Sequence, residues 1–85
     1  MNQKIDLEVT PSLHARFAVA MGLVHVSFML NGKSLPERFS FSFSEAERIA
    51  QQIEETGVWT QFPVIGISAR ALKTFGRQLR EYALP

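Results

Sequence analysis

The sequence has no cysteine among its 85 residues. This absence excludes disulfide bridges, thiolate metal sites and cysteine nucleophiles, and it is typical of a reducing compartment. The two histidines, His14 and His25, form no H-x-H or H-x-x-x-H pair, so we expect no metal site. We expect no cofactor site either, because the glycines are dispersed and build neither a G-x-G-x-x-G turn nor a Walker loop.

Long hydrophobic runs and a strong charge imbalance are also missing. No apolar stretch approaches the roughly 20 residues that cross a bilayer. The first residues, up to Asp6, lack the apolar centre of a signal peptide. We therefore expect a cytoplasmic protein that makes no use of a membrane. The formal net charge of +1 argues against a strongly basic nucleic-acid binder.

Phenylalanine, in contrast, is abundant, with seven in the chain. At 46% hydrophobic and 20% charged residues, the composition is that of one globular domain over residues 1–85. A domain of this size has a small core. The aromatic rings are therefore expected to fill that core or to form a contact with another protein, a second copy included.

The segment from Phe39 to Glu47 is the clearest structural signal. Its first half alternates phenylalanine and serine, which is the period of a strand with one buried face. We expect a strand over about 38–43 with its phenylalanines in the core. Ser44 and Glu47 then have the S-x-x-E spacing of a capping box, which predicts a helix from Glu45 to about Thr56.

Two more strands are indicated by alternation, over residues 4–10 and 23–30. Asn31-Gly32 is a turn signal, and we expect the loop to continue through Pro36. The segment 12–21 has two interpretations. Thr10, Pro11 and Gly22 are suitable helix-end residues and favour a helix, whereas Phe17 and Val19 favour a strand.

The last helix is predicted over residues 69–83, with Ser68 as its cap and Leu72, Phe75 and Leu79 on its buried side. Gly76 in mid-helix suggests close packing against another element. Residues 58–67 contain a proline and a glycine and read as an irregular crossover. The expected fold is therefore α+β: an antiparallel sheet of three or four strands with two C-terminal amphipathic helices packed on one face.

Two features are candidates for binding a partner. Trp59 and Phe62 can act as apolar anchors, because aromatic residues dominate interface hot spots. The last helix groups its basic residues on the side opposite its apolar stripe, with only Glu81 beside them; they are Arg70, Lys73, Arg77 and Arg80. The plainer interpretations are that the rings close the core and that the charges are a solvated helix face.

These features predict a non-catalytic binding module that contacts a protein partner or associates with itself. The alternative is a nucleic-acid-binding or regulatory protein that uses the last helix. We expect no enzyme, because no serine stands in a G-x-S-x-G elbow and the glutamates belong to a helix surface. A catalytic function would require a concave pocket with His14 or His25 beside a carboxylate.

Overall fold

The computed structural model describes residues 4–83. Four strands come first: β1 (Lys4–Thr10), β2 (Leu13–Ala20), β3 (Leu23–Leu30) and β4 (Lys33–Ser42). Two helices follow, α1 (Phe43–Thr56) and α2 (Ala69–Ala83). The expected α+β class with an antiparallel sheet is confirmed, and the predicted bounds of β1, β3 and α2 agree with the structure.

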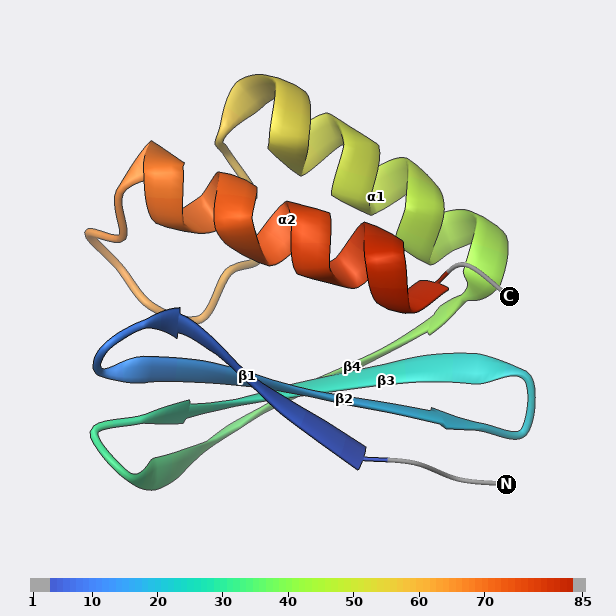
Figure 1. The fold of residues 1–85 in the computed structure, drawn as a ribbon, viewed down its shortest axis with the longest axis horizontal. Helices are drawn as coiled ribbons and strands as arrows, with labels where there is room; N and C mark the ends of the chain where they lie inside the picture. Colours follow the sequence, from blue (N-terminus) through green and yellow to red (C-terminus); the bar gives the residue numbers. More distant parts are fainter. Residues whose placement is uncertain (1–3, 84–85) are drawn as a thin grey trace.

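The sheet is a meander in which each strand pairs antiparallel with the next, in the order β1-β2-β3-β4. Figure 1 shows α1 and α2 side by side on the same side of this sheet, running in opposite directions. Short turns suffice to build the meander because antiparallel neighbours need no crossover. The arrangement has two layers, and within residues 4–83 no element covers the other side of the sheet (Figure 1).

Of the two interpretations of residues 12–21, the helix is wrong and the strand is correct, because this segment forms β2. Its central residue Phe17 pairs with Ile5 of β1 and Val26 of β3. The side chains of Ala15 and Phe17 are fully buried, as the alternation of a strand requires. Pro11 and Gly22, which suggested the ends of a helix, lie in turns between strands. Met21 and Gly22 both have positive φ, 55° and 76°, and connect β2 to β3.

Strand β4 begins at Lys33, where a loop was expected. Its pairing with β3 shifts register between Ser27 and Met29, so the segment around Pro36 bulges out of the ladder. Such a proline is tolerated because β4 is an edge strand, whose outer N–H groups have no neighbouring strand to bind. The sequence-based prediction placed the strand too late because proline is usually read as a strand breaker.

Helix α1 begins two residues earlier than predicted, because Ser42 and not Ser44 is its N-cap. The Glu45 N–H donates to Ser42 Oγ at 3.2 Å, and the Ser42 N–H donates to the Glu45 carboxylate at 3.0 Å. This second bond lowers the pKa of Glu45 below its ordinary value. Because the helix starts earlier, Phe43 is its first residue and has 38% of its surface exposed. The expectation that Phe43 belongs to the core is therefore wrong.

The core lies between the sheet and the helices and is rich in aromatic rings. Phe75 of α2 contacts Phe17 and Phe28 of the sheet, with ring centres 5.9 and 5.3 Å apart. The buried residues of α1 are two alanines and one isoleucine: Ala46, Ala50 and Ile53. A Cβ at Gly76 would lie 3.0 Å from Ile53 Cγ2, so the predicted close packing at this glycine is present.

Candidate functional site

The two aromatic candidates lie at the edge of the core. Phe62 is buried, and its ring centre is 5.0 Å from that of Phe28. Trp59 is partly buried, stacks on Phe75 at 5.8 Å and lies 5.0 Å from Phe39. These contacts occupy most of the surface that an anchor would offer to a partner. The partner-binding role of Trp59 and Phe62 stays a prediction, and their placement favours a structural role.

Three of the four basic candidates form a continuous surface on α2, which we call the basic face: Arg70, Lys73 and Arg77. All three are exposed, and together with Ala69 and Thr74 they line a hollow of about 450 Å³. Over seven residues an α-helix rises about 10 Å, so the charges follow one another along two turns. Within residues 4–83 no ion pair involves any of them. Their charge is therefore available to an external anion.

Arg80 is placed differently. Its guanidinium binds both carboxylate oxygens of Glu54, with Nη2 donating to Oε1 at 3.0 Å and Nε donating to Oε2. This contact connects α2 to α1, and it raises the pKa of Arg80 above its ordinary value. The charge of Arg80 is balanced inside the molecule. We therefore do not include this residue in the basic face, and its partner-binding role stays a prediction.

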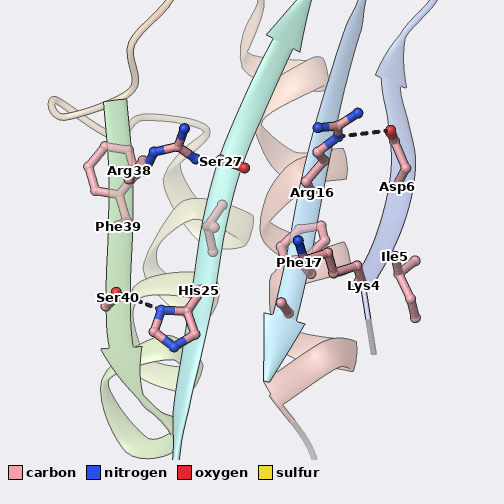
Figure 2. A pocket seen from close by; sticks show the side chains of 12 residues that line it. Lys4, Ile5, Asp6, Arg16, Phe17, His25, Ser27, Arg38, Phe39 and Ser40 are labelled. Atoms are coloured by element: carbon pink, nitrogen blue, oxygen red, sulfur yellow. Dashed lines mark hydrogen bonds and ion pairs between the residues drawn. The ribbon is translucent and has the colours of Figure 1, made fainter. Parts of the chain in front are cut away.

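A further surface, which sequence reasoning did not identify as a site, is the uncovered side of the sheet. We call it the open sheet face. Figure 2 shows it with the helices behind the strands, and it contains a hollow of about 530 Å³. The polar side chains around this hollow come from all four strands: Lys4, Asp6, Arg16, His25, Ser27, Arg38 and Ser40.

The register brings four of these residues into one row across the sheet. Asp6 pairs with Arg16, Arg16 with Ser27, and Ser27 with Arg38. Arg16 donates from Nε to Asp6 Oδ2 at 3.2 Å, whereas Arg38 has no ion pair within residues 4–83. The outward alternation of β2 could have indicated this row, but only after β2 was known to be a strand.

The neighbouring row contains a serine and a histidine in contact. His25 Nδ1 lies 2.8 Å from Ser40 Oγ, and His25 Nε2 lies 3.2 Å from the carbonyl oxygen of Ala20. A carbonyl can only accept, so in the neutral ring Nε2 carries the proton and Nδ1 accepts from the Ser40 hydroxyl. The histidine is thus held by contacts at both ring nitrogens.

The other histidine lies beside a carboxylate, which is the arrangement that a catalytic function would require. His14 Nδ1 is 3.1 Å from Asp6 Oδ1, next to a hollow of about 480 Å³ that also contains Ser12 and Met29. Both side chains are exposed, at 40% and 44%, and Asp6 is shared with Arg16. In this solvated position the pair has the character of a surface contact. The absence of catalysis stays a prediction.

The part of the chain that the structure describes contains no group of three His, Cys, Asp or Glu residues that could hold a metal ion. Among the same residues, neither helix has the length and apolar character needed to cross a membrane.

No protein-family model matches this sequence, and neither a curated protein nor a solved structure matches it.

Proposed function

We propose that this protein is a small non-catalytic binding module whose basic face on α2 receives an acidic segment of a protein partner. The observation that supports this proposal most is the unbalanced charge of Arg70, Lys73 and Arg77 around one hollow. An acidic side chain from a partner would supply the missing counter-charge. Complementary charge of this kind gives an interface its specificity and speeds association.

The size of the basic face favours a protein partner over a nucleic acid. Nucleic-acid binders commonly neutralise about 6–10 phosphates, and their affinity depends on this number. The basic face offers three unpaired cations, and the cations of the open sheet face lie on the side of the sheet away from α2. Three contacts match a short acidic peptide segment better than a phosphate backbone.

The proposal is tested by fluorescence anisotropy with two labelled probes of equal length, a glutamate-rich peptide and a single-stranded oligonucleotide. The protein is expected to bind the peptide at low salt. The triple variant R70Q/K73Q/R77Q should bind it about tenfold more weakly, since exposed charge contacts contribute about 0.2–1 kcal/mol each and three of them sum to roughly 0.6–3 kcal/mol. The control for the loss of an exposed positive charge elsewhere is R48Q, which removes a single charge from α1.

The two probes separate the candidate functions. Tighter binding of the oligonucleotide, with a steep loss of affinity as salt rises, would support the nucleic-acid alternative instead. Failure to bind either probe at low salt would rule out a charge-driven function of the basic face. Light scattering on the same samples reports whether the protein associates with itself, in which case the partner is a second copy.

A further inference from the structure

We propose that the open sheet face is a second binding site, on a different side of the molecule from the basic face, and that it takes a small organic phosphomonoester. The hollow of about 530 Å³ lies within the range of small-molecule sites, about 300–1,000 Å³. Its polar groups converge from four strands, so a single ligand can contact residues that are far apart in the sequence.

The phosphate group is placed by the row Arg16–Ser27–Arg38. Neighbouring strands are about 4.8 Å apart, so the two arginines, on β2 and β4, stand about 10 Å apart with Ser27 between them. Figure 2 shows both guanidinium groups at the same level of the sheet, with that of Arg38 directed toward Ser27. An anion above Ser27 can therefore accept hydrogen bonds from both sides and from the serine hydroxyl.

The charges around the hollow favour a dianion. Lys4, Arg16 and Arg38 supply three positive charges, and Asp6 supplies one negative charge. Asp6 is already engaged, because it accepts from Arg16 Nε and contacts His14. That contact uses only the Nε of Arg16, so its terminal nitrogens have no partner within residues 4–83. The tetrahedral phosphate presents oxygens toward donors on several sides, whereas a carboxylate presents two oxygens in one plane.

The rest of the hollow has space and hydrogen-bonding groups for the organic part of the ligand. A phosphate alone would occupy only part of it, next to the small side chains of Ser27 and Ala18. In the adjacent row the His25–Ser40 pair presents a hydroxyl and an imidazole at fixed positions. These groups can hydrogen-bond to a hydroxyl of the ligand. The hollow is therefore larger than an inorganic anion requires.

The test is an NMR titration of the ¹⁵N-labelled protein with glycerol 1-phosphate, inorganic phosphate and glycerol, all at constant ionic strength. Glycerol 1-phosphate is expected to shift the amides of Arg16, Ser27 and Arg38 in a saturable manner and to bind at least fivefold more tightly than inorganic phosphate. Glycerol should cause no saturable shift there. The variant R38Q should weaken the binding of glycerol 1-phosphate at least fivefold.

The matched control is K33Q, which removes the same charge from an exposed position of the same strand outside the hollow. It should leave the affinity unchanged. Arg38 is exposed and has no ion pair in the described chain, so R38Q is expected to fold. Equal affinity for glycerol 1-phosphate and inorganic phosphate, or unchanged binding by R38Q, would overturn the proposal.

Discussion

At the scale of single residues, two serines compete for the start of α1. Ser42 and Ser44 are each followed three positions later by a glutamate, so the sequence contains two possible capping boxes. The structure uses the first, with Glu45 as its acidic partner. The choice follows from the strand before it. Phe41 pairs with Val24 and Ser42 with Leu23, and the chain can turn into a helix as soon as this ladder ends.

The two serines should therefore respond differently to substitution. We expect Ser42→Ala to lower the free energy of unfolding by about 1 kcal/mol, because it leaves the Glu45 N–H without its acceptor. Ser44→Ala is the matched control and should change the free energy by less than about 0.5 kcal/mol. Urea denaturation of both variants measures the difference. A larger loss for S44A would show that the second box caps the helix.

At the scale of elements, the contact between the two helices depends on Gly76. Glycine in a helix interior costs about 1 kcal/mol relative to alanine. Here it allows α2 to approach α1, since a Cβ would lie 3.1 Å from the carbonyl oxygen of Ala50 and 3.0 Å from Ile53 Cγ2. The Arg80–Glu54 ion pair lies four residues further along the same helix–helix contact. The glycine thus determines the distance at which the helices pack.

We expect Gly76→Ala to destabilise the protein in spite of its better helix propensity. The gain of about 1 kcal/mol in the helix is outweighed by overpacking, which costs about 1–3 kcal/mol, so a net loss of about 1 kcal/mol is expected. Thermal or urea denaturation measures it. Arg77→Ala serves as control because Arg77 is exposed on the same helix. A stabilised G76A variant would mean that α1 can move aside without cost.

At the scale of the whole molecule, one aromatic cluster joins the layers. Phe75 of α2 touches rings from β2, β3 and the crossover between the helices, and Trp59 adds a contact with β4. A chain of this length buries a limited fraction of its surface, so a few large rings supply much of the core. This explains why the crossover contains aromatic residues without forming a regular element.

The cluster predicts the effect of removing Trp59. We expect Trp59→Ala to lower the free energy of unfolding by about 3 kcal/mol. This value is at the lower end of the range for replacing a large buried ring by alanine, because Trp59 is partly exposed. Phe43→Ala, which removes an exposed ring, should cost less than about 1 kcal/mol. Urea denaturation compares the two variants. A W59A protein of unchanged stability that loses self-association would restore Trp59 as an interface anchor.

The elements with a local pattern could be predicted without the structure. Alternation defined β1 and β3, and the apolar spacing with Ser68 defined α2, because these patterns need no information from distant residues. The turn at Asn31-Gly32 was predictable for the same reason, since both residues have positive φ there. The separation of Arg70, Lys73 and Arg77 from the apolar side of α2 also followed from helical periodicity.

The conformation of residues 13–20 depends on contacts with distant parts of the chain. Helix and strand signals were balanced there, and the pairing of Phe17 with strands on both sides decided in favour of a strand. The same pairing brought Arg16, Ser27 and Arg38 into one row, and the packing of α1 on α2 gave Arg80 its partner Glu54. Each of these outcomes joins residues far apart in the chain, and local periodicity contains no information about such contacts.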